Sequence, residues 1–191
     1  MKPFNGYKAE KAAPREHLPA GGYVAEIKDA KEVEYSWGRV LVVSFDIAEG
    51  EKKGFFAADY RSQQQEDKKW RGSYRLTVPK DDGSEGDGRS KRTFGGAMWA
   101  IENSNQGYHW DWNEAGLKGK LVGVLYREKE WEMNGNTGWF TECCAFTDAA
   151  SIRAGSFQTP KPKPKPLAQK AAPAAPANDC LPIPDDGDLP F

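Results

Sequence analysis

The segment YVAEIKDAKEVEYSWGRVLVVSFDI, residues 23–47, holds two apolar-rich runs on either side of a turn signal. In the first run, residues 23–33, apolar and charged positions alternate, as in a strand with one buried face. The turn-prone Ser36, Trp37 and Gly38 follow, and residues 39–47 have the composition of a second strand. The segment therefore predicts a long β-hairpin.

The elements expected after this hairpin follow the order of a small barrel. The patterns predict a third strand at 54–60, a polar helix-permissive segment at 62–70, a short extended piece at 74–78, a flexible acidic loop at 80–88, a helix capped by Ser90 and ending within 103–107, a strand at 120–133, a turn at 134–138 and a returning strand at 139–146. Three strands, a helix and two strands is the order of an OB-fold, a Greek-key barrel that binds oligonucleotides and oligosaccharides. We therefore predict a mainly β, OB-fold-like Greek-key barrel with one or two helices.

The two ends of the chain have compositions that do not fit a folded domain. Nine of the 13 prolines lie in 160–191, and such a segment buries too little apolar surface to offset the entropy lost on ordering. The repeat PKPKPKP at 160–166 favours polyproline II and predicts a semi-rigid basic spacer. We expect a flexible segment at 1–19, the OB-fold-like domain at 20–158, a disordered Pro/Ala/Lys linker at 159–184 and an acidic tip at 185–191.

Several classes of protein are excluded by composition. The longest aliphatic run, residues 40–43, is too short for a transmembrane helix, and the charged N-terminus does not fit a secretory signal. The three cysteines form no disulfide or zinc pattern, which favours the cytoplasm. The two histidines, His17 and His109, lack metal-binding partners at suitable spacing, and no phosphate-binding loop or nucleophile elbow is present. We expect no enzyme activity, no cofactor, no metal and no membrane partner.

Aromatic and basic residues, in contrast, occur together at the predicted hairpins. A protein that binds single strands needs rings on which bases stack and cations that meet the phosphates. The candidate DNA-binding residues are Tyr35, Trp37, Arg39, Lys53, Phe56, Tyr60, Arg61, Arg75, Arg127, Lys129, Trp131 and Trp139. Strand periodicity assigns other rings to the core, namely Phe45, Phe94, Phe140, Phe146 and one of Phe55 and Phe56, and we expect Trp110 and Trp112 to pack over one end of the barrel.

Net charge places a condition on this interpretation. The chain has 27 Lys and Arg against 28 Asp and Glu, a formal net charge of −1, whereas nucleic-acid-binding proteins are usually basic. A binding protein with this balance must gather its cations in one groove. Its affinity should then depend steeply on salt.

The C-terminal sequence Asp185-Asp186-Gly187-Asp188-Leu189-Pro190-Phe191 resembles the acidic tip of bacterial single-stranded-DNA-binding proteins. It departs from that family in the glycine within the acidic run and in leucine where isoleucine is usual. The resemblance implies docking onto replication, recombination or repair proteins such as a helicase, primase, polymerase, nuclease or recombinase. Phe191 would fill an apolar pocket, with Leu189 and Pro190 beside it, while Asp185, Asp186 and Asp188 face a basic rim.

The body of the chain looks more like the divergent members encoded by bacteriophages, which would place it in the cytoplasm of a bacterial host. The sequence thus predicts binding and protection of single-stranded DNA without sequence preference, with partner proteins recruited through the tip. The alternative is an OB-like protein-interaction or assembly module that does not bind DNA. A homo-oligomer remains one option for the assembled state.

Overall fold

A computed structural model describes residues 16–64 and 66–165. The acidic tip at 185–191 and the part of the predicted linker from 166 onward lie outside the described residues. The elements, in chain order, are β1 (Gly21–Tyr35), β2 (Gly38–Ile47), α1 (Phe55–Ser62), β3 (Ser73–Thr77), α2 (Glu85–Ser104), the 3-10 helix η1 (Glu114–Leu117), β4 (Leu121–Met133), β5 (Asn136–Thr147) and α3 (Ala149–Arg153).

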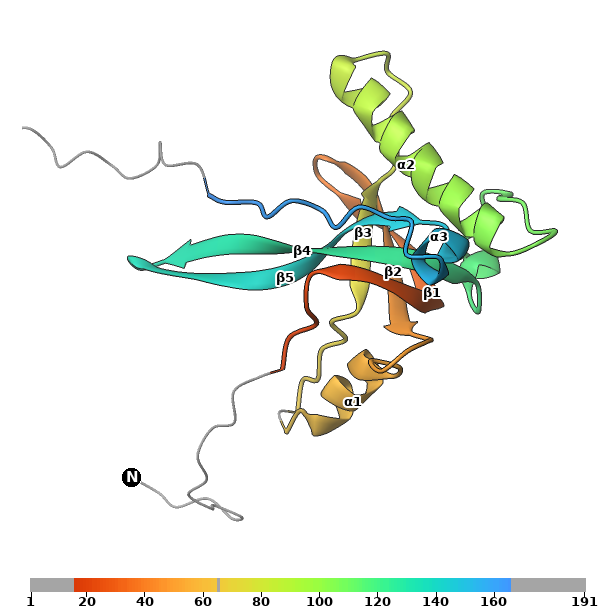
Figure 1. The fold of residues 1–191 in the computed structure, drawn as a ribbon. Coiled ribbons are helices and arrows are strands. Elements are labelled where there is room, and N and C mark those ends of the chain that lie inside the picture. Colours follow the sequence, from red (N-terminus) through yellow and green to blue (C-terminus); the bar gives the residue numbers. More distant parts are fainter. Residues whose placement is uncertain (1–15, 65, 166–191) are drawn as a thin grey trace, which may run out of the picture.

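The five strands form one antiparallel sheet in the order β3-β2-β1-β4-β5. The edge strands β3 and β5 approach each other through side chains: the Tyr74 hydroxyl donates to the Cys144 carbonyl at 3.0 Å, and the Tyr74 and Phe146 rings lie 4.8 Å apart. Figure 1 shows α1 and α2 at opposite ends of β3, with the β4–β5 hairpin projecting to one side. The predicted mainly β, OB-like barrel is confirmed, and its sheet remains open at the seam between β3 and β5.

The core fills the space between the inner face of the sheet and α2. Phe94, Met98 and Ile101 are buried at helical spacing, as predicted. The largest fully buried side chains are Phe45, Ile27, Leu76, Ile101, Leu117, Val43, Val122 and Val124. Of the other phenylalanines assigned to the core, Phe56 is buried, whereas Phe140 and Phe146 are only half-buried.

The predicted third strand at 54–60 is wrong, because this stretch forms α1. Asp46, buried in β2, accepts hydrogen bonds from the amides of Phe56 at 2.9 Å and Ala57 at 3.2 Å. These amides belong to the first turn of α1. The N–H groups of a first turn have no carbonyl acceptor within the helix itself. The cap therefore comes from the preceding strand and not from the helix's own residues, and the third strand of the sheet is the short extended piece, now β3.

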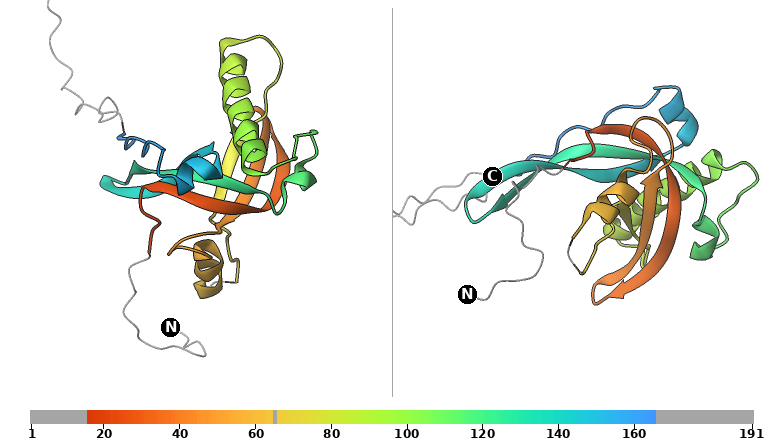
Figure 2. Two further views of the ribbon diagram at one scale, coloured as in Figure 1. Left: turned by 45° about the vertical axis from the view of Figure 1, so that its right-hand side comes forward. Right: turned by 90° about the horizontal axis from the view of Figure 1, so that it is seen from below.

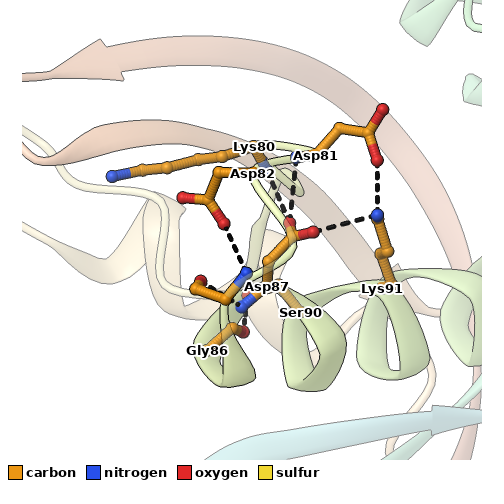
Figure 3. Close-up of polar contacts among 8 residues, drawn as sticks. Lys80, Asp81, Asp82, Gly86, Asp87, Ser90 and Lys91 are labelled. Carbon is orange, nitrogen blue, oxygen red and sulfur yellow. Dashed lines mark hydrogen bonds and ion pairs between the residues drawn. The ribbon is translucent and has the colours of Figure 1, made fainter.

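The acidic loop predicted at 80–88 is also partly wrong, because α2 already begins at Glu85. Its N-cap is Ser84 and not Ser90: the Ser84 hydroxyl accepts from the amide of Asp87 at 3.1 Å. The Asp87 carboxylate in turn accepts from the amide of Lys80 at 2.9 Å and lies 2.9 Å from the Lys91 ammonium (Figure 3). The hydrogen bond from that ammonium lowers the pKa of Asp87. The charged Asp87 carboxylate therefore ties the start of α2 to the preceding loop.

Both described chain ends pack against the barrel, which corrects the predicted domain limits. Leu18 is buried in the core, and its carbonyl accepts from the hydroxyl of Thr141 in β5. Residues 16–19 therefore belong to the folded domain and not to a flexible segment. At the other end, residues 160–165 lie along β4, so the first part of the predicted linker is ordered. Within the described ranges, no helix is both long and apolar enough to cross a membrane.

Candidate nucleic-acid interface

Two long hairpins carry exposed tryptophans, and they project from the body in different directions (Figure 2). At the tip of the β1–β2 hairpin, Trp37 is 57% exposed and stacks on Tyr35 with ring centroids 5.3 Å apart and planes 9° from parallel. Arg39 next to it is 3.3 Å from Glu32. Tyr35 therefore orients Trp37, whose other side faces solvent.

The β4–β5 hairpin separates its side chains onto two faces of opposite charge. Its register pairs Trp131 with Gly138, Lys129 with Phe140 and Arg127 with Glu142. Directly paired residues of antiparallel strands share a face, as do residues two apart along a strand. These six residues therefore lie together on one side, which we call the basic face.

Contacts across the basic face hold its aromatic and cationic groups in place. Trp131 lies over Gly138, where an added Cβ would be 2.8 Å from the indole Nε1. The Lys129 ammonium lies 5.7 Å from the centre of the Phe140 ring. Glu142 accepts from Arg127 at 2.7 Å and from Lys129 at 2.8 Å. Burial raises the pKa of Glu142, but these two hydrogen bonds outweigh that effect and keep it below its ordinary value, so the carboxylate stays charged.

The opposite side of the hairpin, which we call the acidic face, carries Glu128, Glu130 and Glu132. Trp139 pairs with Glu130 and so belongs to this face. The sequence interpretation grouped Trp131 and Trp139 together beside Arg127 and Lys129. The structure corrects that grouping: only Trp131 shares a face with the two cations, and Trp139 lies among carboxylates.

A cleft of about 550 Å³ continues the basic face toward the open seam of the barrel. Arg127 and Phe140 line it from the hairpin, and Tyr74 and Arg75 line it from β3. Arg75 is exposed and has no ion-pair partner among residues 16–64 and 66–165. Burial raises the pKa of Tyr74 to about 12, so its hydroxyl remains protonated and keeps its hydrogen bond across the seam.

The remaining predicted site residues belong to α1 and the turn before it: Lys53, Phe56, Tyr60 and Arg61. Phe56 is only 6% exposed and packs against Phe45, so it cannot stack on a base and is withdrawn from the interface. Tyr60 packs beside Trp70, and Lys68 lies 5.7 Å above its ring. The grouping of these residues depended on a strand that is a helix in the structure.

Three residues that line concave surfaces of the protein were not among the predicted set: Arg71 and Tyr74 in the cleft wall, and Trp99 on α2 at a separate groove. Trp99 is 54% exposed beside a second groove of about 480 Å³ between α2 and β5. A signal for it was present, because Trp99 falls outside the buried stripe of Phe94, Met98 and Ile101 on a helix with 3.6 residues per turn.

In the part of the chain that the structure describes, no three His, Cys, Asp or Glu side chains gather as metal ligands would. What the basic face and the cleft offer is a row of rings with cations beside them. Neither a protein-family model nor a curated protein matches the sequence.

Proposed function

We propose that the protein binds single-stranded DNA without sequence preference, along the basic face of the β4–β5 hairpin and into the cleft at its base. One observation carries this proposal: a single face aligns the rings of Trp131 and Phe140 with Arg127 and Lys129 and leads to Arg75. Every base can stack on an aromatic ring, whatever the DNA sequence, and cations beside the rings contact the phosphates.

The β1–β2 hairpin supplies a second platform. In OB-folds the loops between strands 1 and 2 and between strands 4 and 5 flank the ligand-binding face. Trp37 lies in the first of these positions and Trp131 near the second. A single-stranded DNA that contacted both tryptophans would cross the outer surface of β2 and β3, where Arg75 is exposed.

In a cell, such a protein would coat exposed single strands during DNA replication, recombination or repair. The resemblance of residues 185–191 to the acidic tip of bacterial single-stranded-DNA-binding proteins supports recruitment of partner enzymes through Asp185, Asp186, Asp188, Leu189, Pro190 and Phe191. The likeness of the body of the chain to divergent members encoded by bacteriophages supports a phage-encoded protein that acts in the bacterial cytoplasm.

The test is a titration of fluorescently labelled oligo-dT with the full chain, followed by anisotropy at several salt concentrations. We expect saturable binding that weakens as salt rises, because cations on the protein displace counterions from the phosphates. An unlabelled mixed-sequence strand should compete as well as oligo-dT. A flat titration at low salt would refute the proposal.

A second function, a protein-interaction module, is favoured by one observation. The groove between α2 and β5 is bordered by the exposed Trp99, and an exposed tryptophan beside a groove is typical of a peptide-binding surface. This function predicts no response to oligo-dT, so the same titration separates the two proposals.

A further inference from the structure

The described part of the Pro-Lys repeat, residues 160–165, lies beside the β4–β5 hairpin and pairs with it through one isolated parallel bridge, between Lys163 and Lys129; we call this stretch the added segment. β1 pairs with β4 only between Leu121 and Tyr126, which leaves the outer edge of β4 open from residue 127 onward. The amide of Lys163 donates to the Glu128 carbonyl at 2.8 Å, and the amide of Glu130 donates to the Lys163 carbonyl at 3.0 Å. Figures 1 and 2 show the segment beside the hairpin.

The alternation of proline and lysine fits this position. A strand bonds to its neighbour through the backbone groups of every second residue. Lys163 supplies the inward-facing amide and carbonyl, while Pro162 and Pro164 have no amide hydrogen to present on the outer side. A strand of this composition covers the open edge of β4 without offering a new edge for pairing.

The register of this pairing decides where the lysines lie. Lys163 is the parallel partner of Lys129, and directly paired residues of neighbouring strands direct their side chains to the same side of a sheet. Lys163 therefore lies on the basic face, and Lys161 stands two residues before it in the added segment. Both lysines are exposed.

Lys165 departs from this register and fastens the segment to the acidic face. Its amide donates to the Glu130 carboxylate at 2.9 Å, and its ammonium lies 3.0 Å from the Glu132 carboxylate. The carboxylates of the acidic face thus anchor the segment through Lys165. The side chains of Lys161 and Lys163 remain exposed to solvent.

The added segment brings a further cation to the basic face. This face now carries Arg127, Lys129 and Lys163 against the carboxylate of Glu142, and the exposed Lys161 stands two residues from Lys163. Like charges at directly paired positions, such as Lys129 and Lys163, repel each other and destabilise the pairing. An anion that lies across both strands removes this repulsion, and the phosphates of a single strand stacked on Trp131 are such an anion.

We propose that residues 160–165 are part of the nucleic-acid-binding surface, with Lys161 and Lys163 in contact with the phosphates of a strand whose bases stack on Trp131. This inference rests on the proposed function. It changes the role of the repeat from a spacer to a structural component of the interface.

The test compares full-chain variants in the oligo-dT anisotropy titration. K163Q and the double variant K161Q/K163Q neutralise the proposed contacts, and K170Q removes the same charge from a position later in the same tail, outside the added segment. For single strands, each phosphate contact contributes about 0.7 to the slope of log K against log salt, which is about fivefold in affinity at 0.1 M. We expect about a fivefold loss for K163Q, a larger loss for the double variant, and less than twofold for K170Q.

The outcomes separate this inference from the proposed function. If the unaltered protein binds oligo-dT but K163Q and K170Q lose the same affinity, the inference is wrong and the proposed function stands. If the unaltered protein does not bind, both fail. A measurement without DNA tests the geometry: the amides of Lys163 and Glu130 should be protected from hydrogen exchange in the full chain, and rapid exchange at Lys163 would overturn the pairing.

Discussion

Replacing Trp131 with alanine removes the ring that lies between the two cations of the basic face and the tip of the hairpin. The indole is 39% exposed, and one side of it rests on Gly138. Only the other side is open to a ligand, so Trp131 offers a stacking surface for one base. Stacking of one base on an aromatic side chain contributes about 1–3 kcal/mol, which corresponds to a loss of about 5- to 150-fold in affinity.

Trp139→Ala is the matched control. Trp139 comes from the same hairpin and is more exposed than Trp131, at 51%. If exposure alone decided which rings bind DNA, the loss would be larger for Trp139. The charge of the two faces predicts the opposite, because the carboxylates around Trp139 repel phosphates.

The assay is the anisotropy of labelled oligo-dT at 0.1 M salt, which does not depend on the protein's own tryptophan fluorescence. We expect W131A to weaken binding at least fivefold, which is the lower limit of about 1 kcal/mol for one stacked base, and W139A to weaken it less than twofold. W131F, which keeps an aromatic face, should recover part of the loss. An equal or larger loss for W139A would refute the assignment of the two faces.

Three further predictions concern stability and pH. Asp46→Ala leaves the first amides of α1 without their acceptor and should lower the free energy of unfolding by about 1–3 kcal/mol in a urea titration; an unchanged midpoint would show that the cap does not hold the helix. Gly123→Ala places a Cβ 2.7 Å from Ile152 and should cost about 1–3 kcal/mol, whereas Gly95→Ala, which meets nothing within 4 Å on α2, should stabilise the protein by up to about 1 kcal/mol. The pKa of Glu142 is lowered in the folded state, so its contribution to stability is present above the unfolded pKa and is lost as pH falls through the folded pKa. E142Q should remove this part of the acid dependence of stability. It should also tighten oligo-dT binding at pH 7, because it frees Arg127 and Lys129, and unchanged binding would count against the role of these two cations.

Both hairpins and the buried stripe of α2 were predictable because their signals are local. Alternation of apolar residues, the glycine turns and the spacing of Phe94, Met98 and Ile101 all act within a few residues. The failure at 54–60 has a non-local cause, since the cap of α1 is supplied by Asp46 from β2. Two glycines in the first turn of α2 concealed its start, although Ser84 followed three residues later by Asp87 resembles a capping box.

The division of the hairpin into two faces was also within reach of the sequence. A two-residue turn at Asn134 and Gly135 pairs Met133 with Asn136, and counting back from that pair places Trp131 opposite Gly138. In contrast, the position of residues 160–165 was not predictable, because it depends on β1 leaving β4 at Tyr126. An open strand edge is a property of the assembled sheet and has no signal in the strand itself.

A net charge near zero is compatible with a nucleic-acid partner because the charges of β4 are separated onto its two faces, which an average over the whole chain does not show. Residues 127–132 read Arg-Glu-Lys-Glu-Trp-Glu, and a period of two sends the cations and the indole to one side and the three carboxylates to the other. The carboxylates of Glu130 and Glu132 bind Lys165 and so help to hold Lys163 at the edge of the basic face. One alternating strand thus gathers carboxylates on one face and cations on the other, so the acidic residues that cancel the net charge contribute to the placement of the cations.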